Sequence, residues 1–197
     1  MWDSAPIVLE EHKLLFFTQA KVACTTFKQL FRRMSHLSDW EVHNGADLPH
    51  NPKLNGLSYL YHYSPQQAYQ MMTSDGWTRA IFVRDPKRRV LSAYLDKAAR
   101  KEGHFVRRHC CSRLPERLLN GTSVDACVAE ASGSFRGFLD LISTKCCCNH
   151  HWVPQSYRID PPELWKYINF VGHFENLEAD AKLLLEKIDA WLSLIHI

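Results

Sequence analysis

The side chains best suited to bind an anion gather in the stretch AKVACTTFK near the N-terminus. Lys21 carries an ammonium group, and Thr25 and Thr26 carry hydroxyl donors. Ala23 and Cys24 are small enough to let a ligand approach the backbone. These residue types resemble a phosphate cradle that lacks the glycines of a Walker A motif. The stretch therefore predicts an anion-binding loop; taken alone, it also fits an ordinary threonine-capped helix start.

The elements around this loop predict that it lies at the start of a helix. The apolar run Leu14–Phe17 predicts a short strand buried on both faces, and apolar residues recur at helical spacing from Phe27 to Met34. The first N–H groups of a helix lack intrahelical partners and the helix dipole is positive there. An anion at this position finds donors and a favourable field together.

A second strand-to-helix junction lies in the stretch RAIFVRDPKRRVLSAYLDKAARKEG. Residues 80–83 predict another buried strand, Asp85 an N-cap, Pro86 the first helical position and Gly103 the end of the helix. Arg84 ends the strand at the edge where open α/β sheets bind ligands, and its planar fork suits a terminal phosphate. The alternative for the basic residues that follow is a solvated helix face.

Two anion-binding junctions predict a ligand with two separated anionic groups. The motifs resemble those of the Golgi carbohydrate sulfotransferases of the chondroitin, dermatan and HNK-1 type. AKVACTTFK resembles their 5′-phosphosulfate loop, and Arg84-Asp85-Pro86 followed by Arg89, Ser92 and Tyr94 resembles their 3′-phosphate motif. The blocks HHWVPQS and FVGHFENLEAD, further along the chain, also look like blocks of that family.

The resemblance implies an α/β fold, a P-loop-like three-layer sandwich with a central parallel sheet flanked by helices. It implies the donor 3′-phosphoadenosine 5′-phosphosulfate and in-line transfer of its sulfuryl group to a carbohydrate hydroxyl, without a metal. It also implies the residues that contact the nucleotide: Lys21, Val22, Ala23, Cys24, Thr25, Thr26, Phe27, Arg84, Arg89 and Ser92.

The catalytic roles predicted for this reaction fall on one lysine and one of two histidines. Lys21 would stabilise the charge that develops on the leaving phosphate oxygen. His62 or His151 would act as the base that takes the acceptor proton, and the sequence leaves both open.

The sequence has seven cysteines, an odd number, and the resemblance implies an oxidising lumen in which most of them can pair. Cys24, in the predicted phosphosulfate loop, is expected to be free. The remaining six are expected to form two or three bridges: Cys110, Cys111, Cys127, Cys146, Cys147 and Cys148. Zinc binding by the Cys146–Cys148 run and the histidines after it is disfavoured, because consecutive residues point in different directions. We therefore predict no metal site.

Length and composition fit one catalytic domain over residues 1–197, since no glycine- or proline-rich linker divides the chain. A net charge of +3 gives no support for nucleic-acid binding, although local basic patches can attract an anionic, glycosaminoglycan-like polymer. The N-terminal residues do not read as a signal peptide. From the resemblance we expect a type II Golgi protein whose membrane anchor and stem lie upstream, and a C-terminus that is truncated. The sequon Asn120-Gly121-Thr122 is consistent with a lumenal glycoprotein.

Three segments outside the motifs give weaker predictions. Residues 44–56 are rich in Asn, Pro and Gly and predict a loop. Ser64-Pro65 predicts a turn that opens a helix, and residues 178–192 predict a helix that packs on the sheet.

Two other functions fit parts of this pattern. A nucleotide or small-molecule kinase shares the strand–loop–helix cradle, but it needs a GK[ST]-type loop and a metal-binding aspartate, and Asp85 fits a helix cap better. A glycan- or nucleotide-binding module without turnover is the second alternative. The acceptor sugar is not readable from the sequence.

Overall fold

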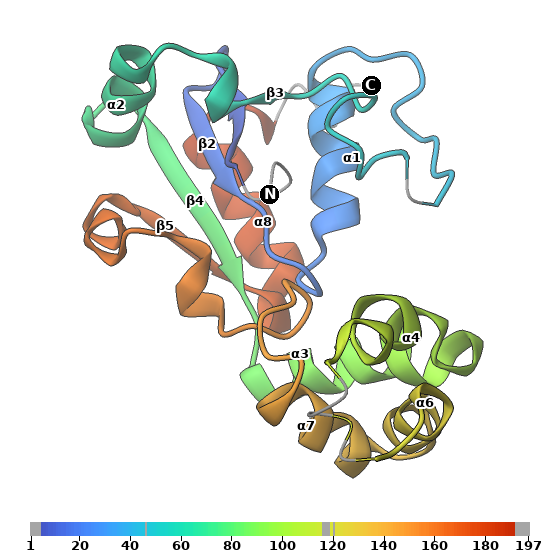
Figure 1. Cartoon of the computed structure of the whole chain (residues 1–197). Coiled ribbons are helices and arrows are strands. Elements are labelled where there is room, and N and C mark those ends of the chain that lie inside the picture. Colours follow the sequence, from blue (N-terminus) through green and yellow to red (C-terminus); the bar gives the residue numbers. More distant parts are fainter. Residues whose placement is uncertain (1–4, 46, 116–118, 120, 192–197) are drawn as a thin grey trace. The chain divides into compact units, whose positions relative to one another are not determined.

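The computed structural model describes residues 5–45, 47–115, 119 and 121–191 of the chain (Figure 1). The chain divides into two compact units. The first comprises residues 1–84 and 155–197, and the second comprises residues 85–154. The second unit is thus an insertion in the sequence of the first.

The first unit is built on a mixed sheet in the order β3-β1-β2-β4-β5 within the described residues. The strands are β1 (Ile7–Leu9), β2 (Leu14–Phe17), β3 (Ser58–Tyr59), β4 (Thr78–Val83) and β5 (Phe170–His173). β2, β4 and β5 are parallel, as predicted, whereas β1 is antiparallel to both of its neighbours. A short turn joins β1 to β2, in which Lys13 donates its N–H to the carbonyl of Glu10 at 2.9 Å. A turn this short allows only an antiparallel pair.

Helices and turns cover both faces of this sheet, which confirms the predicted three-layer α/β sandwich. Leu14 and Phe16 of β2 pack with α1 and α8 on one face, and Leu15 and Phe17 pack with α2 and residues 159–168 on the other. Alternate side chains of a strand point to opposite faces, so an uninterrupted apolar run fits a strand covered on both sides. The helices of this unit are α1 (Cys24–Met34), α2 (Pro65–Thr73) and α8 (Leu177–Lys187).

The ends of α2 and α8 test two predictions. Ser64 caps α2 by accepting the N–H of Gln67 at 3.3 Å, and Pro65 is the first helical residue, as predicted. α8 ends at Lys187, and Asp189 beyond it adopts a φ of 54°. The helix predicted over residues 178–192 is therefore wrong at residues 188–190, and residue 192 lies outside the described residues. The four apolar residues expected to pack on the sheet do lie in its core: Ala181, Leu184, Leu185 and Ile188.

The second unit is helical in its described residues. Its α-helices are α3 (Pro86–Ala93), α4 (His104–His109), α6 (Val124–Gly133) and α7 (Phe135–Thr144). Asp85 caps α3 by accepting the N–H of Arg88 at 2.8 Å, and Pro86 is the first helical residue, as predicted. α3 continues as a π-helical turn (Tyr94–Ala99), and a 3-10 turn then ends at Gly103, whose φ is 72°. The helical stretch thus stops at the predicted glycine, although its second half is not α-helical.

Two disulfides close the second unit. Cys110 is bonded to Cys146 and Cys111 to Cys127, so two adjacent cysteines take different partners. Cys24, Cys147 and Cys148 are free thiols. Two bridges and a free Cys24 agree with the prediction. Cys146 forms a disulfide with Cys110, so its sulfur is not available as a thiolate ligand for a metal.

The structure does not test the expectations about the membrane anchor, the glycosylation sequon and the C-terminus. No helix among the described residues is long and apolar enough to cross a membrane. Asn120, the acceptor of the predicted sequon, lies outside the described residues, as do residues 192–197.

Candidate functional site

The predicted anion-binding loop is a left-handed turn between β2 and α1. Lys21 and Ala23 have φ values of 67° and 52°, in the region that favours glycine, and Ala23 is the N-cap of α1. Between them Val22 is almost fully buried and donates its N–H to the carbonyl of Gln19 at 3.2 Å. Non-glycine residues hold such a conformation only where their surroundings impose it. The buried Val22 therefore anchors a loop whose shape is fixed before any ligand arrives.

The first turn of α1 supplies donors to this loop. The N–H groups of Cys24, Thr25 and Thr26 precede the first intrahelical bond, in which Phe27 donates to the carbonyl of Ala23 at 3.0 Å. Ala23 has no side-chain oxygen to cap them. Phe27 itself is buried in the core, so it shapes the loop rather than offering a donor. The same holds for the side chain of Val22.

Arg84 lies directly beside this loop. β2 and β4 are adjacent and parallel, with Phe17 paired to Ile81, so their carboxyl ends meet at one edge. Arg84 follows β4 and donates from Nη1 to the carbonyl oxygen of Lys21 at 3.1 Å. The two predicted junctions are thus brought together within the first unit. Their contact is a finding that spacing alone did not give.

One further contact holds the Arg84 side chain, and one of its nitrogens has no partner among the described residues. Its guanidinium carbon lies 4.1 Å from the centre of the Phe174 ring, an aromatic contact that sequence reasoning missed. Phe174 stands in the FVGHFENLEAD block directly after β5, and its place at a strand end was the signal available. The Nε of Arg84 is buried and has no hydrogen-bond partner among the described residues. A buried guanidinium N–H without an acceptor is costly, and a bound anion would satisfy it.

Arg158 is a second basic residue that sequence reasoning missed. Its Nε donates to the backbone carbonyl of Thr18, the residue that follows β2. This hydrogen bond holds the residue that leads from β2 into the anion-binding loop. No local pattern marks it, because its partner lies 140 residues away.

Arg89 and Ser92, the remaining residues of the predicted 3′-phosphate motif, lie in the second unit on α3. Arg89 is 1% exposed, and its two terminal nitrogens donate to the carbonyls of Val153 and His150, each at 2.8 Å. Its fork therefore joins α3 to the HHWVPQS block. Ser92 is half-buried. The assignment of both to the nucleotide stays a prediction.

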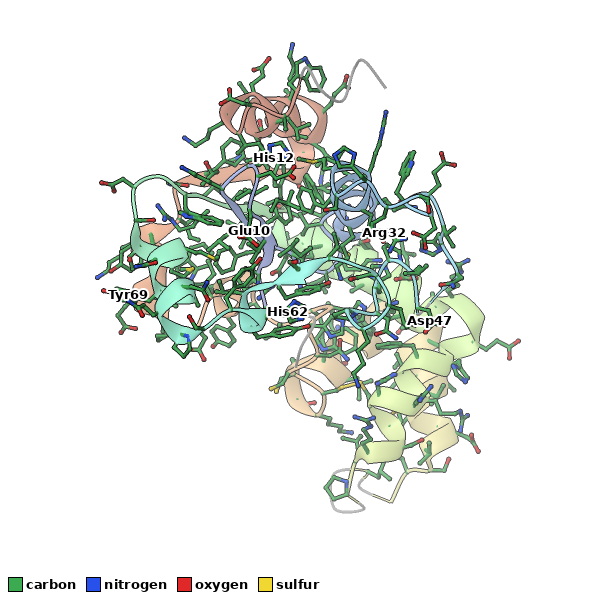
Figure 2. All side chains as sticks on the ribbon, turned by 90° about the horizontal axis from the view of Figure 1, so that it is seen from above. Glu10, His12, Arg32, Asp47, His62 and Tyr69 are labelled. Carbon is green, nitrogen blue, oxygen red and sulfur yellow. A yellow bond between two sulfur atoms is a disulfide. The ribbon has the colours of Figure 1, made fainter. Side chains whose placement is uncertain are left out.

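The two candidate bases differ in which ring nitrogen carries the proton. His62 is labelled in Figure 2. Its Nδ1 accepts the backbone N–H of Tyr59 at 3.2 Å, so in the neutral ring the proton lies on Nε2. The Nδ1 of His151 lies 2.7 Å from Oδ1 of Asn149, which also accepts the N–H of His151. Since that oxygen only accepts, His151 keeps its proton on Nδ1 and its lone pair on Nε2. His151 has the tautomer of a base; His62 would first have to give up its bond to Tyr59.

The surroundings of His151 keep a neighbouring imidazole neutral. Phe105 stacks on His109 with ring centres 4.3 Å apart and meets the His151 ring edge-on at 5.0 Å. Burial lowers the pKa of His109, and the positive charges of Arg113, Arg108, Lys97 and His104 lower it further. Phe105 is therefore in contact with His151 and with a neutral imidazole at His109.

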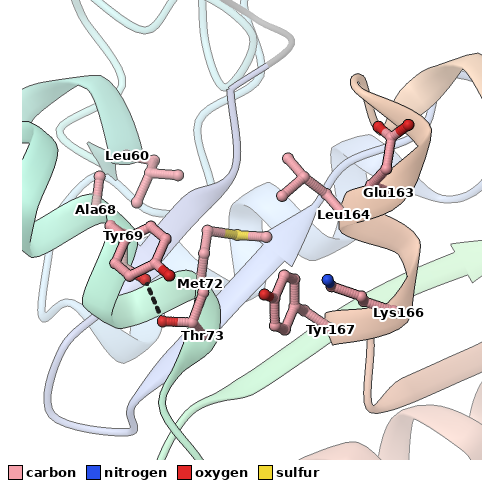
Figure 3. A pocket seen from close by; sticks show the side chains of 9 residues that line it. All are labelled: Leu60, Ala68, Tyr69, Met72, Thr73, Glu163, Leu164, Lys166 and Tyr167. Carbon is pink, nitrogen blue, oxygen red and sulfur yellow. Dashed lines mark hydrogen bonds between the residues drawn. The ribbon is translucent and has the colours of Figure 1, made fainter.

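One distinct pocket lies away from these residues. It has a volume of about 350 Å³ and opens between α2 and the turn at residues 162–167 (Figure 3). Met72, Thr73 and Tyr167 line its walls, and they precede the start of β4 and β5. The pocket thus lies toward the amino edge of the parallel strands, opposite the edge that bears Lys21 and Arg84. We assign it no role in the candidate site.

Comparison with known proteins agrees with this geometry. A family model described as "Sulfotransferase family" matches residues 5–193. Carbohydrate sulfotransferase 14 of Danio rerio is 28% identical over 187 residues, which cover 93% of this chain and 48% of that protein. Carbohydrate sulfotransferase 12 of Mus musculus is 30% identical over 211 residues, which cover 94% and 49%. Carbohydrate sulfotransferase 9 of Homo sapiens is 26% identical over 196 residues, which cover 93% and 40%.

The chain spans about half the length of the curated relatives it matches. No solved structure matches it. The resemblance predicted from the motifs is confirmed at the level of the family.

Proposed function

Because the chain belongs to the sulfotransferase family, we propose that it transfers a sulfuryl group from 3′-phosphoadenosine 5′-phosphosulfate to a carbohydrate hydroxyl. The observation that carries the proposal is the contact between Arg84 and the backbone of Lys21. It brings two anion-binding junctions to one sheet edge, as a ligand with phosphate groups at two positions requires. The names of the matched relatives support a carbohydrate as the acceptor.

The residues of the first unit fit such a nucleotide. Thr25 and Thr26 lie in the first turn of α1, where a 5′-phosphosulfate finds free amides and the positive end of the helix dipole. Arg84 keeps a buried Nε–H without an acceptor, and a 3′-phosphate would satisfy it. The nucleotide supplies the activated sulfuryl group, and the protein supplies its orientation and charge stabilisation.

Lys21 has the role of stabilising the leaving phosphate oxygen in this proposal. Its left-handed backbone places it at the turn between β2 and α1, next to the helix start. Charge stabilisation by a preorganised loop accounts for most of the rate gain in reactions of this kind. We propose no metal in the reaction, because a sulfuryl group carries less charge than a γ-phosphoryl group.

His151 or His62 would remove the proton of the acceptor hydroxyl. We favour His151, because its neutral tautomer leaves the lone pair on Nε2. Asn149 would accept the Nδ1 proton while Nε2 takes up the proton of the acceptor hydroxyl, so the imidazolium that forms keeps the same orientation. Arg89, Ser92 and His151 lie in the second unit, and their roles rest on the family resemblance.

We further propose that the chain works in the Golgi lumen as part of a type II membrane protein. The two disulfides of the second unit support an oxidising compartment. An anionic, glycosaminoglycan-like polymer is the acceptor we propose within the carbohydrates.

Calorimetric titration tests the proposal. The probe is adenosine 3′,5′-bisphosphate, the desulfated product, and ATP with magnesium is the comparator. We expect the bisphosphate to bind and ATP to bind far more weakly. A radiolabelled sulfuryl donor and a panel of desulfated glycans then test transfer. Preference for ATP would contradict the proposal in favour of a kinase, and binding of the bisphosphate without transfer to any glycan would favour a binding module.

A further inference from the structure

We infer that His50 is a positioning residue of the phosphosulfate loop, which orients the Thr25 hydroxyl toward the 5′-phosphosulfate. The inference rests on the proposed function, because it concerns the same nucleotide site. Sequence patterns gave His50 no role, since it lies in a loop without periodicity. Its place comes from the structure alone.

The contact that carries the inference joins the loop at residues 44–56, which contains His50, to the start of α1. Nε2 of His50 lies 3.0 Å from Oγ1 of Thr25. Thr25 is the second residue of α1, in the turn whose N–H groups face the anion. A threonine hydroxyl rotates to suit its partners, so a fixed neighbour decides where its proton points.

The backbone around His50 is held by a buried asparagine. Asn55 is fully buried, and its Nδ2 donates to the carbonyl of Pro49 at 2.9 Å and to the Tyr59 hydroxyl at 2.7 Å. Its Oδ1 accepts the N–H of Leu57 at 3.0 Å. Pro49 directly precedes His50, so these bonds hold the residue that leads into the imidazole. Buried amide groups with several partners fix one local geometry.

The same loop is tied back to α1 at a second point. Arg32, two turns after Thr25 and 1% exposed, donates from Nη1 to the carbonyl of Asn55. Its Nη2 lies 2.6 Å from a carboxylate oxygen of Asp39 and donates to the Asp39 carbonyl at 2.9 Å. Arg32 and Asp47, a residue of the loop at 44–56, are labelled in Figure 2. The loop at residues 44–56 is therefore bonded to α1 at two points. One is Arg32, and the other is the contact between His50 and Thr25.

The chemistry of the hydroxyl fixes the direction of this hydrogen bond. A phosphosulfate oxygen only accepts, so Thr25 must donate its O–H to it. The Thr25 oxygen can then only accept from His50, which requires the proton of the neutral imidazole to lie on Nε2. In this arrangement His50 donates to Thr25, and Thr25 donates to the anion. Without His50, the hydroxyl proton has no fixed direction and must be ordered when the nucleotide binds.

Matched variants separate this role from simple support of the fold. His50→Phe keeps a ring and removes the donor, and His50→Gln keeps an N–H donor. Thr25→Val removes the hydroxyl, and His43→Phe is the control, because His43 is exposed and phenylalanine keeps its edge-on ring contact with His50, whose ring centre is 6.3 Å away. Affinities are measured for adenosine 3′,5′-bisphosphate and for adenosine 3′-monophosphate, which lacks the 5′-phosphate. Thermal unfolding of each variant verifies that it is folded.

We expect His50→Phe to weaken bisphosphate binding about tenfold, the upper end of the scale for one hydrogen bond between neutral groups, and to leave 3′-monophosphate binding unchanged. His50→Gln should recover most of the loss. Combined with Thr25→Val, His50→Phe should add no further loss, because the two residues act through one hydroxyl. His43→Phe should bind like the wild type.

Three results would overturn the inference. Unchanged bisphosphate affinity in His50→Phe would remove His50 from the site. An equal loss for the 3′-monophosphate, or additive losses in the double variant, would reduce His50 to support of the loop. Failure of the wild type to bind the bisphosphate would refute the proposed function itself, and that failure is seen before any variant is measured.

Discussion

Replacement of Arg84 tests the candidate site most directly, since this side chain joins its two halves. Arg84→Met keeps an apolar stem against Phe174 and removes the guanidinium, whereas Arg84→Lys keeps a charge without the planar fork. Arg88→Met is the matched control, because Arg88 is an exposed arginine four positions further on. The variants thus separate charge, fork geometry and general basicity.

The expected effects differ for binding and for stability. Loss of a charge-assisted contact to a phosphate costs about 2–3 kcal/mol, which raises the Kd of adenosine 3′,5′-bisphosphate roughly 30- to 160-fold. Arg84→Met also loses the bond to the Lys21 carbonyl at 3.1 Å, worth about 1 kcal/mol. Removing the buried, unpartnered Nε relieves a cost of about the same size. The free energy of unfolding should therefore change by less than about 1 kcal/mol.

Calorimetry measures the affinities, and urea denaturation measures the stability of the same samples. Arg84→Lys should fall between the wild type and Arg84→Met in affinity. Arg88→Met should bind like the wild type. The reasoning is refuted if Arg84→Met binds the bisphosphate as tightly as the wild type, or if Arg88→Met loses as much affinity as Arg84→Met.

Lys21→Ala should lower kcat about a hundredfold, which is the scale of one electrostatic group that stabilises a transition state. The loss of bisphosphate affinity should be smaller. A near-normal kcat in steady-state kinetics would show that Lys21 takes no part in the chemistry. Gly172→Ala should destabilise the first unit by about 1–3 kcal/mol in urea denaturation, because the new Cβ would lie 2.4 Å from the buried Phe82 ring; a change below about 0.5 kcal/mol would contradict this packing. Asp180→Asn should lower stability at neutral pH and not at an acid pH below the depressed pKa of Asp180. The backbone N–H of His173, donated to Asp180 at 2.7 Å, lowers the pKa of this carboxyl, so its contribution is present above the ordinary value near 3.8 and is lost as the pH falls through the depressed value. Equal destabilisation at both pH values would show that the charge is not responsible.

The sequence predicted those parts of the molecule that depend on local patterns. The run Leu14–Phe17 is a strand because four apolar residues fill both faces, and Asp85-Pro86 starts a helix because cap and first residue are adjacent. Both junctions at the sheet edge follow from such short-range rules. β1 was not predicted, because a strand of three residues carries no periodicity.

The parts that escaped prediction depend on partners far along the chain. Arg89 matches a phosphate-binding pattern, yet its guanidinium is bonded to carbonyls more than 60 residues away. His50 belongs to a loop that is fixed by the buried Asn55 and Arg32, and no spacing rule indicates this. The left-handed turn at Lys21 was equally invisible, because lysine rarely adopts it. Residue type predicted which groups can meet an anion, and only tertiary structure shows which of them already have other partners.

The chain leaves the first unit at Arg84 and returns to it at Gln155. Two hydrogen bonds join these residues, and we call this pair of bonds the clasp. The Gln155 amide accepts the backbone N–H of Arg84 at 2.9 Å and donates to its carbonyl at 2.7 Å. Residues 85–154 therefore form a cassette whose two ends are held by one glutamine. All described strands lie outside residues 85–154, so exchanging this segment at the clasp would leave the residues of the sheet unchanged. An exchange that breaks the clasp would disturb Arg84 first, so nucleotide affinity would report a poor graft before global stability does.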